Sequence, residues 1–157
     1  MVAANDAPLA VDDAYTTTED TPLTVVAPGV LGNDSDAEGD PLTAVLDTGP
    51  TNGTLALSDD GSFTYTPTLN YNGIVTFTYR ASDGTDTSGT ATVTITVVAV
   101  NDAPLAVDDA YTTTEDIPLT VPAPGVLGND VDVNGDVLEA VLADDVATGT
   151  LLSLIHI

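Results

Sequence analysis

Cysteine is absent from this 157-residue chain, so disulfides and thiolate metal sites are excluded. Lysine is absent too, and the single arginine, Arg80, leaves a formal net charge of -24. Because no basic stripe exists to displace counterions from phosphates, nucleic acids and anionic membrane surfaces are poor partners. No apolar run reaches the roughly 18 residues that a membrane span requires, so we expect no membrane insertion.

Polar helix formers and aromatic side chains are also scarce. Glutamine is absent, glutamate is rare and aromatic residues make up 4% of the chain, whereas threonine and valine are frequent. β-Branched residues favour strands, and a hydrophobic fraction of 43% is sufficient for a buried core. The composition therefore predicts an all-β protein.

The sequence contains a long internal repeat. The segment NDAPLAVDDAYTTTED begins at Asn5 and again at Asn101, and the register holds without a gap to Leu55 and Leu151, with about three quarters of the positions identical. This pattern is typical of tandem copies of one domain type. We expect residues 1–4 to be the tail of a preceding repeat, 5–100 a complete repeat and 101–151 a truncated second repeat.

The last six residues, 152–157, read LSLIHI and break the repeat. They resemble the in-frame translation of a sequencing adaptor, and we set them aside as a scar together with His156, the only histidine. The alternative is a genuine apolar strand end. The opening MVAANDAP has no basic and no apolar stretch of the kind that a signal peptide requires.

Three segments of the first repeat, 63–66, 75–79 and 93–97, alternate apolar residues with threonine. A period of two is typical of half-buried strands, and dipeptides such as Asn52-Gly53 and Asp60-Gly61 mark turns between them. Seven short strands without a helical pattern indicate an immunoglobulin-like β-sandwich. The predicted strands are 9–18, 21–27, 42–47, 53–58, 62–67, 74–82 and 90–99.

Acidic residues cluster in one type of loop. Residues 32–42, GNDSDAEGDPL, and residues 128–138, GNDVDVNGDVL, share the pattern D-x-D-x-[EN]-G-D. Consecutive strands of an antiparallel sandwich usually alternate in direction, so loops fall alternately at its two poles. This places residues 33–40 and 82–86 at the same pole as the linker that enters the first repeat.

Carboxylates gathered at one pole repel one another unless a cation lies among them. Ca²⁺ suits such a site because it takes six to eight oxygen ligands, including backbone carbonyls, in flexible geometry. The alternative is that these are solvated, turn-forming aspartates. The side chains expected to gather there are Asp6, Asp34, Asp36, Asp40 and Asp83.

An EF-hand and an enzyme are disfavoured. If Asp34 is counted as position one, position twelve is Val45, where an EF-hand requires a bidentate glutamate. The Asp47-Thr48-Gly49 triplet lacks the second copy that an aspartic protease needs, and no histidine outside the scar is available for a catalytic triad. We therefore expect no enzymatic activity.

The motifs NDAP, the glutamate of TTTED, DxDxxGD and ASDG resemble those of cadherin-like and bacterial immunoglobulin-like tandem repeats in large surface and biofilm adhesins. The resemblance covers Asn5 to Leu151 and implies a Greek-key β-sandwich with Ca²⁺ bound between successive domains. The linker departs from the cadherin pattern at Ala99 and Ala103, which implies fewer or weaker ions. The implied ligands are Glu19, Asn101, Asp102, Asp130 and Asp132 at the junction of the repeats, Asn5, Asp6, Asp34, Asp36 and Asp83 at the top of the first, and Asp40 and Asp136 in the two acidic loops.

These expectations combine into one functional hypothesis. The chain would be a calcium-rigidified spacer of an extracellular, cell-surface bacterial adhesin that supports adhesion or biofilm formation. Its partners would be neighbouring repeats of the same chain, with cell-surface glycans or proteins contacted through other domains. The alternative is a glycan-binding or protein-binding immunoglobulin-like module without a metal-dependent role.

Overall fold

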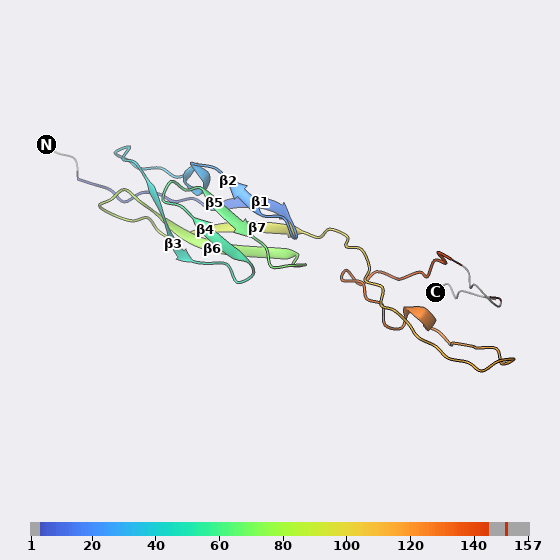
Figure 1. Cartoon of the computed structure of the whole chain (residues 1–157). Helices are drawn as coiled ribbons and strands as arrows, with labels where there is room; N and C mark the ends of the chain where they lie inside the picture. The colour runs from blue at the N-terminus through green and yellow to red at the C-terminus, as the bar shows by residue number, and fades with distance from the viewer. Residues whose placement is uncertain (1–3, 145–149, 151–157) are drawn as a thin grey trace. The chain divides into compact units, whose positions relative to one another are not determined.

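The computed structural model of the chain describes residues 4–144 and residue 150 (Figure 1). The chain divides into two compact units, Met1–Val100 and Asn101–Ile157. The described residues contain no helix with the length and apolar content needed to span a bilayer.

The first unit consists of two β-sheets, as expected for a Greek-key sandwich. One sheet has the strand order β1-β7-β6-β3 and the other β2-β5-β4. Strands β1 and β7 are parallel, whereas the other pairs are antiparallel. The strands are β1 (Asp13–Thr18), β2 (Leu23–Val25), β3 (Thr43–Thr48), β4 (Thr54–Leu57), β5 (Phe63–Thr66), β6 (Gly73–Ser82) and β7 (Ala91–Val98), and a 3-10 helix, η1 (Gly29–Leu31), precedes β3.

The alternation in the sequence sets which side of each strand is buried. From Val75 in β6 and Ala91 in β7, every second residue is apolar and buried, and the threonines between them are at least partly exposed. Phe63 of β5 lies at the centre of the core, where its ring makes edge-to-face contacts with Tyr15 at 5.1 Å and Phe77 at 5.5 Å between centroids. The core therefore lies between the two sheets and holds the loops at each pole in fixed positions.

The first two strands are shorter than the sequence predicts. The strand expected from residue 9 begins at Asp13, because the preceding residues bond to the acidic loop instead, with Leu9 and Ser35 forming an isolated bridge. The strand expected to reach residue 27 ends at Val25, and η1 follows. The helix was not predicted; within it Val30 is fully buried and donates its N–H to the carbonyl of Gly61 at 3.0 Å.

The second unit forms no strand within residues 101–144 and 150, although the repeat predicted its first three strands and the start of a fourth. It contains a 3-10 helix, η2 (Gly125–Leu127), and an isolated bridge between Leu105 and Val131. In the first unit, β1, β2 and β3 pair with β7, β5 and β6. The described part of the second unit has no counterpart of those three partners.

Candidate metal centre

One end of the first unit brings together three segments that are distant in the sequence. The Asn5 side-chain amide donates to Asp83 Oδ2 at 2.9 Å and to Asp86 Oδ2 at 3.0 Å. The backbone N–H of Asp6 donates to Glu38 Oε2 at 3.1 Å. The entering linker, the loop after η1 and the loop after β6 therefore meet at one pole (Figure 1).

The acidic loop is shaped by one carboxylate oxygen. Asp36 Oδ1 accepts the backbone N–H groups of Glu38 and Asp40, both at 3.0 Å. Gly39 has φ +79°, a conformation that suits glycine, and completes the turn. The other oxygen, Asp36 Oδ2, is buried and has no hydrogen-bond partner. A buried acceptor without a donor is costly, so this oxygen is a candidate cation ligand.

Asp34 faces the interior of the unit. Its Oδ1 accepts the N–H of Val11 at 2.8 Å, and its two oxygens lie 3.0 and 2.9 Å from the hydroxyl oxygen of Tyr79. Burial raises the pKa of Asp34. The carboxylate thus fixes the linker and the loop to strand β6, which is a structural role that the sequence pattern did not indicate.

The Tyr79 hydroxyl is surrounded by acceptors. Its oxygen lies 2.6 Å from the carbonyl oxygen of Val30, 3.3 Å from that of Val11 and 3.4 Å from Asp13 Oδ2. A phenol has only one proton to donate, so a protonated carboxyl improves the hydrogen bonding of this cluster. Burial, followed by the charges of Asp34 and Asp12, raises the pKa of Asp13 to about 6. The sequence motifs did not indicate Asp13 or Tyr79 as members of this cluster. The only signal was that both occupy inward-facing positions of their strands.

The raised pKa of Asp13 predicts a pH-dependent stability. Because the pKa of Asp13 in the folded state, about 6, lies above its ordinary value of 3.8, this group stabilises the fold fully below pH 3.8, and the stabilisation is lost as the pH rises through 6. Asp13→Asn should therefore make the first unit more stable at pH 7 and remove this decline between pH 4 and 6. Urea denaturation at a series of pH values in chelator measures both effects; a decline as large in the variant as in the unaltered chain would contradict the assignment, because Asp34, whose pKa is also raised, accounts for only part of it.

Glu19 lies at the opposite pole, where the chain leaves the first unit. It is 3% exposed, its N–H donates to the Val98 carbonyl at 2.9 Å and its Oε1 accepts the Val100 N–H at 2.6 Å. Its Oε2 is buried without a partner. Next to it, Asp20 Oδ1 accepts the N–H of Asn70 at 2.8 Å. The glutamate therefore fixes the exit segment and has one oxygen available to a cation.

The second unit repeats the loop and linker geometry of the first. Asp130 Oδ1 accepts the Val107 N–H at 2.8 Å, and Asp132 Oδ1 accepts the Asp136 N–H at 3.0 Å. The same contacts are made 96 residues earlier by Asp34 with Val11 and by Asp36 with Asp40. These loops therefore depend on local hydrogen bonds rather than on a completed sandwich.

The linker of the second unit also repeats its counterpart. The Asp102 N–H donates to Asn134 Oδ1 at 2.7 Å, where Asp6 uses Glu38. The Asn101 amide donates to the Asp102 carbonyl at 3.1 Å. Asp102 Oδ2 is buried without a partner. An amide oxygen thus replaces a carboxylate oxygen at the same contact, and the geometry persists without that charge.

The unpartnered oxygens suit a hard cation. In the described part of the chain, the buried side-chain oxygens or nitrogens without hydrogen-bond partners are Glu19 Oε2, Asp36 Oδ2 and Asp102 Oδ2, and all three residues belong to the predicted ligand set. Within residues 4–144 and residue 150, no group of three or more aspartate, glutamate, histidine or cysteine side chains is placed so that it could hold a metal ion. A cation at these loops would therefore need backbone carbonyls and water to complete its coordination.

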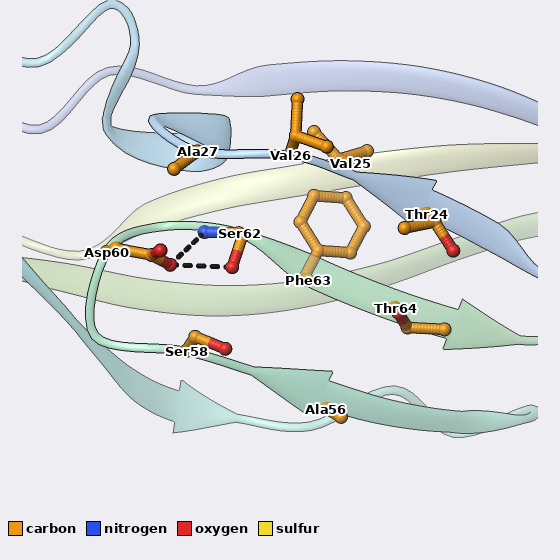
Figure 2. Close-up of a pocket in the computed structure, with 10 residues that line it drawn as sticks. All are labelled: Thr24, Val25, Val26, Ala27, Ala56, Ser58, Asp60, Ser62, Phe63 and Thr64. Atoms are coloured by element: carbon orange, nitrogen blue, oxygen red, sulfur yellow. Dashed lines mark hydrogen bonds between the residues drawn. The ribbon is translucent and has the colours of Figure 1, made fainter.

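A shallow groove of about 330 Å³ lies elsewhere, along β2 and β5 (Figure 2). Its carboxylate, Asp60, accepts both the N–H and the hydroxyl of Ser62 at 3.0 and 2.6 Å, which lowers its pKa. These bonds occupy the charged group within its own turn, so the groove presents no catalytic grouping. Its lining residues are Thr24, Val25, Val26, Ala27, Ala56, Ser58, Asp60, Ser62, Phe63 and Thr64.

Comparison with known proteins gives both units a family. Residues 5–99 match the model of a bacterial cadherin-like domain, and residues 101–154 match that of a bacterial Ig domain. No curated protein matches the chain.

Among solved structures, the endo-fucoidan hydrolase MfFcnA4 from glycoside hydrolase family 107 is similar, with 25% identity and a TM-score of 0.47 over 64% of this chain and 14% of the hydrolase. A nucleoside hydrolase-related hypothetical protein from Saccharophagus degradans that is associated with carbohydrate metabolism has 18% identity and a TM-score of 0.43 over 60% of this chain and 26% of its own. This chain thus spans a small part of each of these proteins.

The cadherin-like match covers the complete sandwich and more than half of the residues. Domains of these two kinds are typically non-catalytic structural modules of surface proteins, and they confirm the predicted adhesin-type tandem repeat. The chain therefore belongs to the bacterial cadherin-like domain family, with a bacterial Ig domain following its cadherin-like domain.

Proposed function

We propose that this chain is a calcium-stiffened spacer of an extracellular bacterial adhesin, supporting cell adhesion or biofilm formation. The observation that carries the proposal is the set of buried carboxylate oxygens without hydrogen-bond partners at Glu19, Asp36 and Asp102. Asp102 lies in the linker, Asp36 lies in the acidic loop, and Glu19 bonds to the segment by which the chain leaves the first unit. These segments control how freely consecutive domains move. A bound divalent cation would satisfy these oxygens and neutralise the neighbouring acids.

The ligands are divided between the two units. Bound Ca²⁺ would supply charge neutralisation and coordination bonds. Asp34 and Asp130 hold their loops through backbone N–H groups and leave the exposed acids in place. The residues proposed to bind Ca²⁺ ions at separate places are Asn5, Asp6, Asp36, Asp40 and Asp83 in the first unit, Asn101, Asp102, Asp132 and Asp136 in the second, and Glu19 at the opposite pole of the first.

The mechanical consequence concerns the contact between the linker backbone and the acidic loop. In the first unit the backbone of Asp6 is fixed to the acidic loop by one exposed hydrogen bond of 3.1 Å, to Glu38. A cation shared by linker and loop would replace this bond with several stronger contacts and remove hinge freedom at the NDAP segment. The string of domains would then act as a stiff spacer.

Calcium should stabilise the first unit measurably. For sites in the affinity range of extracellular modules, a Kd of about 10⁻⁴ to 10⁻³ M, 10 mM Ca²⁺ should add about 1.4 to 2.7 kcal/mol per site to the free energy of unfolding. Asp36→Asn keeps the oxygen that accepts the Glu38 and Asp40 N–H groups but replaces the unpartnered carboxylate oxygen with an uncharged amide nitrogen, which cannot bind a cation. The variant should lose most of the calcium increment while remaining folded in chelator, as followed by titration calorimetry and thermal unfolding.

Asp47→Asn is the matched control. Asp47 lies on β3, away from the acidic loops, and pairs with Arg80 at 3.3 Å. It should keep the whole calcium increment. Small-angle scattering of the full chain should show a narrower range of extensions in Ca²⁺ than in chelator, and Asp36→Asn combined with Asp132→Asn should abolish the difference. Equal calcium increments in all variants, or no heat of binding in the unaltered chain, would refute the proposal.

A further inference from the structure

The sequence contains three Asn-Gly pairs, and each lies in a different environment. They are Asn52-Gly53, Asn72-Gly73 and Asn134-Gly135. Because glycine has no Cβ atom, its backbone nitrogen can approach and attack the side-chain carbonyl carbon of the asparagine before it. This attack releases the side-chain nitrogen as ammonia, and hydrolysis then leaves a carboxylate. In a folded chain the reaction depends on how firmly each glycine nitrogen is held.

The two pairs of the first unit are restrained by hydrogen bonds and strand pairing. The carbonyl of Asn52 accepts the Tyr65 hydroxyl at 2.8 Å. The N–H of Gly53, in the same peptide group, donates to Thr68 Oγ1 at 2.8 Å. Gly73 is the first residue of β6 and pairs with β7. Neither glycine nitrogen can therefore turn toward the preceding side chain without breaking native contacts.

The third pair lies in the acidic loop of the second unit and is much less restrained. Asn134 and Gly135 are both exposed, and a Cβ atom at Gly135 would meet nothing within 4 Å. The Gly135 N–H donates to the Asp132 carbonyl at 3.3 Å, which is longer than the usual range for an N–H···O bond. The glycine nitrogen thus has open space around it and only one long hydrogen bond to break.

A backbone donor is directed at the amide of Asn134. The N–H of Asp102 donates to Asn134 Oδ1 at 2.7 Å. Attack of the Gly135 nitrogen on Asn134 Cγ would turn this oxygen into an oxyanion, and a hydrogen bond to a charged oxygen is stronger than one to a neutral amide. The linker N–H therefore stabilises the transition state more than the ground state, as the donors of an oxyanion hole do.

We propose that Asn134 is a self-deamidation site that the backbone N–H of Asp102 activates. The Gly135 nitrogen forms a bond with Asn134 Cγ while the bond from Cγ to Nδ2 breaks. The proton of the glycine N–H passes through solvent to Nδ2, which leaves as ammonia. Water then opens the cyclic imide, and hydrolysis at Cγ gives aspartate whereas hydrolysis at the main-chain carbonyl carbon gives isoaspartate. The reaction consumes one water and needs no other reactant.

The aspartate product restores a charge that the first unit has at the same position. Glu38, 96 residues before Asn134, accepts the Asp6 N–H at 3.1 Å with a carboxylate oxygen. Deamidation leaves an oxygen in place to accept the Asp102 N–H and adds the negative charge that the encoded amide lacks. The consequence for calcium rests on the proposed function: the second acidic loop would bind Ca²⁺ more tightly after the reaction.

The test follows each Asn-Gly pair by peptide mass spectrometry as a gain of one mass unit. The full chain is incubated with chelator in mildly alkaline buffer, once folded and once in urea, so that each pair has its own unfolded reference rate. Folding should slow Asn52 and Asn72 by about tenfold or more, whereas Asn134 should react at least as fast as in urea. Slowing of Asn134 to the same extent as Asn52 would overturn the proposal.

Two substitutions at Asp102 separate activation from simple exposure. Asp102→Pro removes the backbone N–H, whereas Asp102→Ala keeps it and removes the same carboxylate. Loss of a hydrogen bond to a developing charge should make Asn134 react about tenfold more slowly in Asp102→Pro than in Asp102→Ala. The rate at Asn52 should be the same in both variants. Equal rates at Asn134 would overturn the proposed activation.

Calcium titration of Asn134→Asp keeps this inference separate from the spacer function. The variant should bind Ca²⁺ about tenfold more tightly than the freshly prepared, unaltered chain, because one further charge faces a divalent ion. Equal affinities would contradict the predicted consequence of deamidation. An absence of calcium binding in both forms would refute the spacer function, while the deamidation rates, measured in chelator, would still decide whether Asn134 modifies itself.

Discussion

Phe77→Ala is expected to remove most of the stability of the first unit. Phe77 is 1% exposed, points between the two sheets from β6 and meets the ring of Phe63 edge to face at 5.5 Å. Truncation of a buried phenylalanine costs about 3 to 5 kcal/mol, against about 5 to 15 kcal/mol for the whole free energy of unfolding of a domain. Urea denaturation followed by circular dichroism should show a large fall in the midpoint, with part of the population unfolded in water.

Ile74→Ala is the control for that loss. Ile74 lies on the same strand but on its outer face and is 68% exposed. Its truncation should change the free energy of unfolding by no more than about 0.5 kcal/mol. Similar losses in the two variants would mean that the two faces of β6 are equally buried, which would contradict the assignment of Phe77 to the core and of Ile74 to the outer face.

Gly61→Ala is expected to cause the second large loss. Gly61 has φ +82°, and a Cβ atom there would lie 2.0 Å from the carbonyl oxygen of Pro28, which belongs to the backbone and has little freedom to move. The contact holds η1 against the turn between β4 and β5, beside the bond from the Val30 N–H. To avoid this collision the turn and the helix must move apart, so we expect the free energy of unfolding to fall by about 3 kcal/mol or more.

Gly84→Ala isolates the backbone contribution. Gly84 has a similar conformation, φ +91°, but a Cβ atom there meets nothing within 4 Å. The substitution should cost only the strain of the left-handed conformation, about 1 to 2 kcal/mol. Urea denaturation of the two variants gives their free energies of unfolding, and the difference between the two losses is the contribution of the collision. A loss at Gly61 no greater than that at Gly84 would contradict the close approach of η1.

The strands of the first unit were predictable because alternation encodes them directly. In β6 and β7 the apolar residues and threonines keep a period of two, and the predicted bounds differ from the observed ones by a single residue at either end. The start of β1 and the helix η1 were not predictable in this way. Both depend on hydrogen bonds between distant residues, such as Leu9 with Ser35 and Val30 with Gly61, that leave no local pattern.

The candidate site was predictable as a location and less so in its details. Alternating strand directions correctly placed Asn5 beside Asp83 and Asp6 beside the acidic loop. The same reasoning gave Asp34 and Asp36 equal roles, although one carboxylate bonds to Tyr79 and the other keeps an unpartnered oxygen. That distinction depends on which side chain the fold turns inward, and a motif written as D-x-D does not contain it.

The parallel pairing of β1 with β7 determines how the first unit would respond to tension. Six residue pairs join the two strands, from Asp13 with Val93 to Thr18 with Val98. Because the strands are parallel, a pull on the chain before β1 and after β7 draws them along each other in opposite directions. The hydrogen bonds between them are then loaded together in shear rather than opened one after another, so rupture requires that the whole ladder fail at once. Under such a pull the first unit would rely on this ladder more than on the sheet that contains β2, β4 and β5.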